Sequence, residues 1–271
     1  MAFRPIYVDS IGTGDRITAV SDDWILVEEG VQVVSTSSSF DGDNGIDALG
    51  TTGVYMIIEG TVGATNDPGF IIAGQSTIET DGMAIVAGSQ GSVQIADSGT
   101  VFGEIPITYT GPDTNVVNDG TIIAEDVGIF VEGDLNPFVF DAAFVNNGSM
   151  QSNGTGILIK LSSFLDIENH GNITTNGRVI LSNTTVELSN SGSIRSVDNT
   201  AIDAFEGGNT IFNSGSIEAL LDAIDLGRNS SPNVVVNDGS IISRTRSAID
   251  MYNDQSTGDR LVTRGIVEAD D

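Results

Sequence analysis

The chain has 271 residues, and its 38 Asp and Glu against 10 Lys and Arg give a formal net charge of −28. This balance argues against a nucleic-acid partner, whose phosphates need clustered Lys and Arg, and against a polybasic membrane-surface protein. The chain has no cysteine, which excludes disulfides, thiolate metal ligands and a thiol nucleophile. No apolar run approaches the roughly 20 residues that span a bilayer, so membrane insertion is not expected.

Residues 1–25 do not match the repeat that follows them. Their large apolar side chains are Phe3, Ile6, Tyr7 and Trp24. Such residues are typical of a cap that closes the end of a repeat core, so we expect a cap over 1–25 and one repeat domain over 26–271. The start of the chain lacks the apolar run of a signal peptide, which leaves export through a C-terminal signal or, alternatively, a cytoplasmic protein.

A turn signature then recurs along the chain: an apolar residue, any residue, Asn, any residue, Gly, most often Ser or Thr, and Ile or Met. Its first clear copy is Val116 to Ile122, and weaker copies without Asn precede it from Leu26 onward. The glycines of the six clear copies are Gly120, Gly148, Gly171, Gly192, Gly215 and Gly239. A repeat of this kind predicts a stack of similar units.

A second signature follows each turn by about eight or nine residues, with Ala201-Ile-Asp, Ala223-Ile-Asp and Ala248-Ile-Asp as its most regular copies. Both signatures alternate with a period of two, which indicates short strands. Such strands bury a face only when successive coils stack, about 4.8 Å apart. The predicted fold is therefore an all-β, right-handed parallel β-helix of about nine or ten coils of roughly 22–24 residues. Residues 102–115 and 132–143 interrupt the period and are predicted to be loops.

The alternation places the turn asparagines inside the coil, at a bend. They are Asn118, Asn146, Asn169, Asn190, Asn213 and Asn237. Stacked amides can satisfy one another along the helix, so the pattern predicts an internal ladder with a structural role. The glycine two residues later is expected to supply a turn residue with positive φ.

In the second signature the isoleucines point inward, so Asp203, Asp225 and Asp250 are expected to point outward. In register, their three carboxylates would lie in a line with a spacing of about 4.8 Å. Such a row either binds Ca²⁺ or forms a solvated acidic stripe. Calcium is the cofactor that the sequence suggests.

The same outward positions in earlier coils are assigned to Phe130, Leu158 and Ile180. The neighbouring loop carries Phe138 and Phe140. Two interpretations stay open: the loop covers the three side chains, or they form an interface with a second copy or another protein.

Candidate catalytic groups are few. His170 is the sole histidine, at an outward turn position, and is interpreted as a surface residue that supplies neither a Ser-His-Asp triad nor a metal site. Lys160 and Arg178 lie on adjacent coils, but clustered carboxylates of the kind a lyase uses do not accompany them. The sequence therefore favours a protein that is not an enzyme.

The turns and their Ala-Ile-Asp partners resemble the solenoids of large bacterial surface and secreted proteins. More closely, residues 26–267 resemble the N-terminal β-helical region of RTX-type (haemolysin-type) calcium-binding secreted proteins, which are acidic, poor in lysine and exported without an N-terminal signal peptide. Thr257 to Leu261 keeps the Asp-x-aliphatic part of that family's calcium nonapeptide.

The resemblance implies a secreted, non-enzymatic structural or adhesive module, with a cell-surface or polysaccharide ligand. Two alternatives are a polysaccharide-acting β-helix enzyme of the lyase or epimerase type, and a trimeric phage-type fibre. Because residues 268–271 directly follow a repeat turn, we expect either a continuation of the chain or a partner, such as a second copy, at that end.

Overall fold

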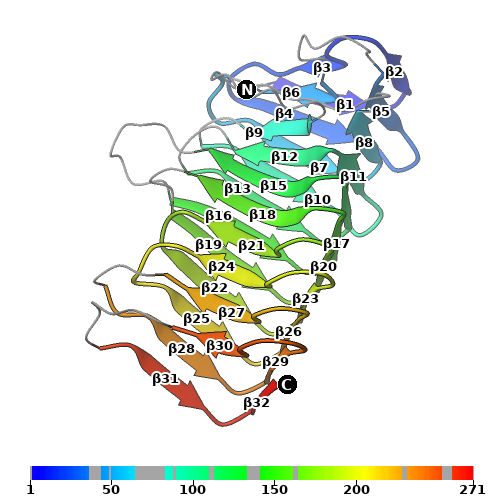
Figure 1. Cartoon of the computed structure of the whole chain (residues 1–271). Coiled ribbons are helices and arrows are strands. Elements are labelled where there is room, and N and C mark those ends of the chain that lie inside the picture. Colours follow the sequence, from blue (N-terminus) through cyan, green and yellow to red (C-terminus); the bar gives the residue numbers. More distant parts are fainter. Residues whose placement is uncertain are drawn as a thin grey trace.

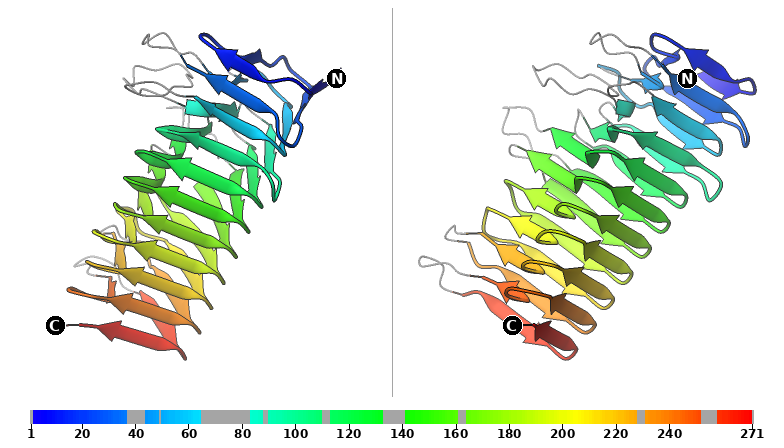
Figure 2. Two further views of the ribbon diagram at one scale, coloured as in Figure 1. Left: turned by 90° about the vertical axis from the view of Figure 1, so that its right-hand side faces the viewer. Right: turned by 45° about the vertical axis from the view of Figure 1, so that its right-hand side comes forward.

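The structure is a computed structural model. It describes residues 2–36, 44–48, 50–64, 83–87, 90–109, 113–132, 141–160, 164–227, 231–251 and 258–270. Within these ranges the chain forms 32 β-strands and no helix, so no helix there could cross a membrane. The strands build a tall stack of coils with the two termini at opposite ends (Figures 1 and 2).

Three parallel sheets run along the stack, and each coil contributes one strand to each sheet in turn. Sheet A contains β1 (Ala2–Ile6), β4 (Asp23–Val27), β7 (Tyr55–Ile58), β10 (Ser92–Ile95), β13 (Asn115–Asn118), β16 (Asp141–Asn146), β19 (Phe164–Asn169), β22 (Val186–Asn190), β25 (Thr210–Asn213), β28 (Val234–Asn237) and β31 (Arg260–Thr263). Sheet B contains β2 (Ser10–Gly12), β5 (Gln32–Ser35), β8 (Thr61–Ala64), β11 (Thr100–Gly103), β14 (Thr121–Ala124), β17 (Ser149–Ser152), β20 (Asn172–Thr175), β23 (Ser193–Ser196), β26 (Ser216–Ala219), β29 (Ser240–Ser243) and β32 (Ile266–Ala269). Sheet C contains β3 (Ile17–Thr18), β6 (Ile46–Asp47), β9 (Met83–Ala87), β12 (Ile105–Tyr109), β15 (Val127–Glu132), β18 (Thr155–Lys160), β21 (Ile180–Ser182), β24 (Ile202–Ala204), β27 (Ile224–Leu226) and β30 (Ile249–Asp250).

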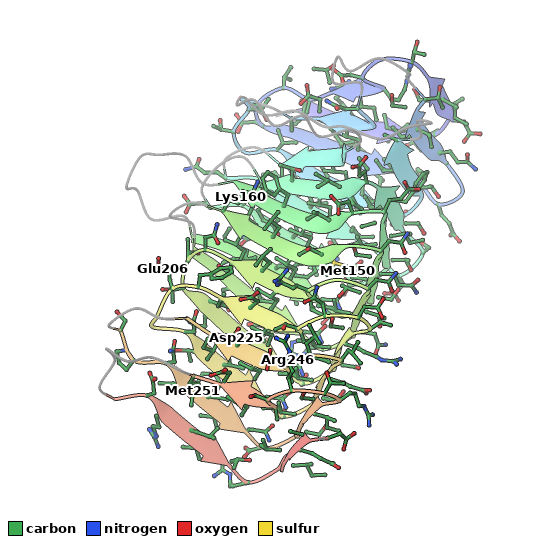
Figure 3. All side chains as sticks on the ribbon, viewed as in Figure 1. Met150, Lys160, Glu206, Asp225, Arg246 and Met251 are labelled. Carbon is green, nitrogen blue, oxygen red and sulfur yellow. The ribbon has the colours of Figure 1, made fainter. Side chains whose placement is uncertain are left out.

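The predicted parallel β-helix is therefore confirmed, and its right-handed sense stays a prediction. Each sheet stacks one inward column of apolar side chains in strict register. In sheet C, for example, Ile157, Ile180 and Ile202 follow one another on adjacent strands and are fully buried. Met150, labelled in Figure 3, occupies the matching column of sheet B and is also fully buried. Burial of each large apolar side chain contributes about 1.5–3 kcal/mol.

The asparagine ladder at the bend between sheets A and B is also confirmed. In each link the amide nitrogen Nδ2 donates to the amide oxygen Oδ1 of the next coil at 2.7 Å, from Asn118 to Asn237. Nδ2 also donates to a backbone carbonyl of the next coil, as Asn190 does to Ser216 O at 3.1 Å. All six side chains are at least 98% buried, so the ladder satisfies polar groups that water does not reach.

The role expected for the turn glycines is wrong. The six ladder glycines do not adopt positive φ. Glycine is needed there because the coils approach too closely for a side chain: a Cβ built on Gly192 would lie 2.1 Å from the carbonyl oxygen of Gly171. The same contact, at 1.9–2.1 Å, recurs from Gly148 to Gly265.

The predicted cap at residues 1–25 consists mainly of a first coil that pairs in register with the second. Phe3 and Tyr7 do not close the core, because they are 62% and 66% exposed. Arg4 instead holds an inward position, in register with the buried Ile25. Its Nη1 donates to Oδ2 of the buried Asp23 and to Thr18 O, each at 2.9 Å, so a charged pair lies at this end of the core.

The loop predicted over residues 102–115 is largely wrong, because strands β11, β12 and β13 occupy most of it. Tyr109 is fully buried, and its hydroxyl donates to Ala143 O at 3.0 Å across the core. Burial raises the pKa of this phenol well above its usual value. In the second predicted loop, residues 141–143 belong to β16, and 133–140 lie outside the described residues.

Candidate functional site

The three aspartates predicted to bind calcium, here called the acidic column, do stack in register on β24, β27 and β30. Asp203 is nevertheless only 7% exposed, and its Oδ2 accepts a hydrogen bond from Arg178 Nε at 2.5 Å. Among the described residues, no group of three or more Asp, Glu or His side chains is placed to hold a metal ion. Calcium binding at Asp225 and Asp250 stays a prediction.

The predicted outward apolar column is correct at two of three positions. Phe130 and Leu158 pair in register, but Leu181 follows them, whereas Ile180 is fully buried in the core. The assignment aligned Ile180 with Leu158, whereas the structure pairs Ile180 with Ile157, and a shift of one residue moves a side chain to the other face of a strand. Phe130 is only 4% exposed, and the Nζ of Lys160 lies 5.2 Å from its ring centroid. Phe138 and Phe140 lie outside the described residues, so both interpretations of the column stay open.

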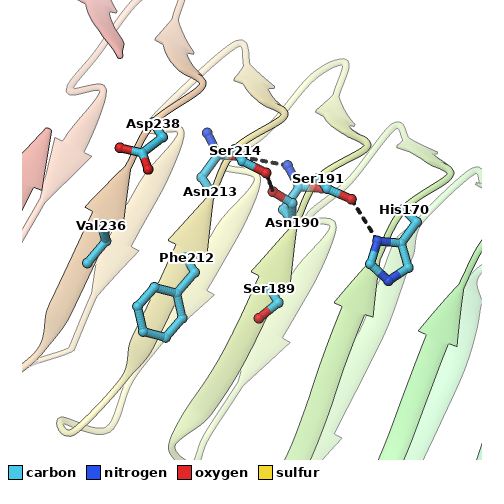
Figure 4. A pocket seen from close by; sticks show the side chains of 9 residues that line it. All are labelled: His170, Ser189, Asn190, Ser191, Phe212, Asn213, Ser214, Val236 and Asp238. Carbon is cyan, nitrogen blue, oxygen red and sulfur yellow. Dashed lines mark hydrogen bonds between the residues drawn. The ribbon is translucent and has the colours of Figure 1, made fainter. Parts of the chain in front are cut away.

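A shallow groove of about 250 Å³ lies on the outside of sheet A, over β22, β25 and β28 (Figure 4). We call it the Phe212 groove. Its lining residues are His170, Ser189, Asn190, Ser191, Phe212, Asn213, Ser214, Val236 and Asp238. One side of the groove is formed by residues on the outer face of these strands, and the other side by the turn residues that directly follow strands of sheet A. The repeat therefore builds the groove.

His170 lies at one end of this groove and is exposed, as the sequence interpretation predicts, and its ring has two side-chain neighbours. Its Nδ1 lies 2.6 Å from Ser191 Oγ, and its Nε2 lies 3.4 Å from Glu168 Oε2. The order of groups, Ser-His-Glu, is that of a hydrolase triad. The repeat places His170 and Ser191, 21 positions apart, at equivalent turn positions of adjacent coils, but it does not predict the orientation of their side chains.

This constellation has no backbone oxyanion hole beside Ser191. The backbone N–H groups of Ser191 and Gly192 donate to Asn169 O at 2.8 and 3.0 Å, and that of Ser193 donates to Gly171 O at 2.9 Å. Acyl transfer needs preorganised donors aimed at the developing oxyanion, and these donors are already used by the inter-coil ladder. The hydroxyl and imidazole groups are therefore better suited to hydrogen-bonding a bound ligand.

At the other end of the groove, Asp238 is paired with Arg264. Nε and Nη2 of the guanidinium donate to the two carboxylate oxygens at 2.7 and 3.0 Å. These hydrogen bonds lower the pKa of Asp238, with a further contribution from the positive charge, so the carboxylate stays ionised.

The fold thus defines a β-solenoid protein of the parallel β-helix class, with a groove on one face. Comparison with protein-family models, with curated proteins and with solved structures gave no match.

Proposed function

We propose that the chain is a non-enzymatic, adhesive and structural β-helix module of a secreted, RTX-like bacterial protein. The observation that supports this proposal is the contrast between its inner and outer columns. Inside, one residue type repeats over many coils, as in the asparagine ladder. Outside, one register column of sheet A reads Glu168, Ser189, Phe212 and Val236. A uniform interior with a varied exterior is suited to displaying binding surfaces on a rigid support.

The test is retention of the purified protein on bacterial cells and on insoluble polysaccharides, measured together with any release of sugar ends. We expect the protein to sediment with at least one surface and to release neither reducing ends nor unsaturated products. Accumulation of either product would contradict the proposal and favour the lyase or epimerase alternative. Absence of retention on every surface would contradict the adhesive role.

Calcium association is the second part of the proposal, and it follows from the resemblance to RTX proteins and from the acidic column. Its test is thermal unfolding with millimolar Ca²⁺ or Mg²⁺. A rise in melting temperature that is specific for Ca²⁺ and is lost in Asp225→Asn would support binding there. Equal curves with both cations would contradict it.

Hydrolysis is a second candidate function, favoured only by the Glu168, His170 and Ser191 constellation. We expect no turnover of ester substrates, because the neighbouring N–H groups are already used. A measurable esterase activity that disappears in Ser191→Ala but persists in the neighbouring Ser189→Ala would overturn this expectation.

A further inference from the structure

The Phe212 groove combines an uncovered aromatic ring with a rim of hydroxyl groups. We propose that it binds a neutral pyranose unit of a polysaccharide. The inference rests on the proposed adhesive function and names the ligand class and the site.

The first argument is the environment of the Phe212 ring. The side chain is 45% exposed on the outer face of β25, and its neighbours in register are Ser189 on β22 and Val236 on β28 (Figure 4). Neither side chain is large enough to cover a phenyl face. An aromatic ring in such a position offers an apolar platform to the C–H face of a sugar ring.

Two other outward aromatic residues of sheet A differ in this respect. Trp24 and Tyr55 pair in register on β4 and β7, with ring centroids 5.2 Å apart and planes inclined by 32°. Each of these rings therefore lies against the other. The Phe212 ring has no such aromatic partner in its column, whose register neighbours are serine and valine.

The second argument is the polar rim. Turn residues Ser191 and Ser214 and the carboxylate of Asp238 line the groove beside the ring, and His170 closes one end. Ser214 Oγ donates to Asn190 O at 3.4 Å and Ser191 Oγ is paired with His170 Nδ1, so the hydroxyls and the ionised carboxylate offer mainly acceptors to the hydroxyl groups of a sugar. Few polar groups around an apolar platform are typical of small-ligand sites.

The third argument is charge, which favours a neutral sugar over an acidic one. Glu168 lies beside His170 at one end of the groove, Asp238 lines the other end, and Arg264 is already paired with Asp238. The whole chain carries a formal charge of −28, so a polyuronate or a sulfated glycan would be repelled during approach. Repulsion of this kind gives selectivity against the wrong ligand.

The experiment titrates the full chain with neutral β-glucan hexasaccharide and with hexagalacturonate, and follows binding by calorimetry and by saturation-transfer NMR of the sugar protons. We expect binding of the neutral sugar, a tenfold or greater loss in Phe212→Ala, and retention in Phe212→Tyr. The matched control is Phe205→Ala, which removes a similarly exposed ring (50%) that is not among the groove's lining residues and should leave affinity unchanged. Ser214→Ala should lower affinity by a few-fold.

Equal affinity of Phe212→Ala and the parent would overturn the site. Tighter binding of hexagalacturonate would overturn the neutral ligand class. If the parent sediments with cells that have been treated with periodate but not with cells treated with protease, its ligand is a protein and the saccharide proposal fails, while the adhesive function stands. If the parent sediments neither with untreated cells nor with insoluble polysaccharides, the adhesive function itself is overturned.

Discussion

The bend between sheets A and B is built in two ways in the two halves of the molecule. In the early coils its inward position holds Val27, Ile58 and Ile95, which are fully buried. From the fifth to the tenth coil the same register position holds asparagine, beginning with Asn118, and the last strand holds Thr263. Because both halves form the same bend, the side chain at this position does not create it. A close-packed glycine follows this position in the third and fourth coils, at Gly60 and Gly99, as it does in the asparagine half, whereas Gly30 of the second coil has no atom within 4 Å.

The junction between the two halves has a physical cost. Asn118 Oδ1 is buried without a protein hydrogen-bond partner in the described part of the chain, because Ile95 before it has no donor. The ladder is directional, since each Nδ2 donates toward the C-terminus, so the deficit falls on its first member alone. At the other end Asn237 Nδ2 donates to Thr263 Oγ1 at 3.3 Å and to Ile266 O at 3.0 Å.

The largest expected effect tests whether glycine determines the bend in both halves. We expect Gly192→Ala and Gly60→Ala each to lower the free energy of unfolding by about 4 kcal/mol or more. The new methyl groups would lie 2.1 and 2.4 Å from backbone carbonyl oxygens of neighbouring turns. The control is Gly30→Ala, where φ is +80° but no atom lies within 4 Å, and where a cost of only about 1–2 kcal/mol is expected. Urea unfolding measures all three, and a mild effect at Gly60 alone would confine the requirement to the asparagine half.

The next prediction compares the loss of an asparagine in the middle of the ladder with the loss of its first asparagine. Asn190→Leu should lower stability by about 1–3 kcal/mol, because it leaves Asn213 Oδ1 without a donor and removes the acceptor of Asn169 Nδ2. Asn118→Leu should cost clearly less, because it removes one unsatisfied oxygen while creating another at Asn146. Equal losses in the two variants, measured by urea unfolding, would show that the ladder stabilises by packing alone.

The repeat was sufficient to predict the fold, the asparagine ladder and the alternation of faces, because each depends on local periodicity. It failed at Ile180, where the alignment of the second signature is one residue out of register with the structure. It also missed Asn209, whose Nδ2 donates to Asn233 Oδ1 at 2.9 Å, since this second buried pair lies outside the turn signature. The repeat places the residues of the Phe212 groove on neighbouring coils, but it does not predict the groove itself, because the space between outward side chains depends on their sizes and conformations.

The third prediction concerns the first coil, where a charged pair takes the place of further apolar stacking. Arg4→Met should lower stability by about 1–2 kcal/mol, because Asp23 is 1% exposed and would lose its charged donor. The double variant Arg4→Met with Asp23→Asn should recover part of the loss, since it removes the buried charge. Thermal unfolding at low and moderate salt measures both, and an additive loss in the double variant would contradict a coupling between the two residues.

The smallest expected effect concerns the outer face of sheet A. The outward position that holds aromatic residues in the early coils holds Asp166 and Glu187 in later coils, where these two residues pair in register. Partial burial raises the pKa of Asp166, and the nearby Glu168 carboxylate raises it further. The folded state therefore holds this proton more tightly than the unfolded chain, whose aspartate pKa is about 3.9. Stability is consequently lost as the pH rises through the folded-state pKa, and the penalty is complete above it.

Asp166→Asn removes this penalty, so the variant should exceed the parent in stability at pH 7 by up to about 0.5 kcal/mol. The gain should fade as the pH falls below about 4, where the parent carboxyl is protonated in both states. Asp198→Asn is the matched control, because it removes the same charge from an exposed position. Its gain in stability measures only the effect of lowering the overall negative charge. If the two variants gain equally at pH 7, general repulsion rather than local burial governs this face of the later coils.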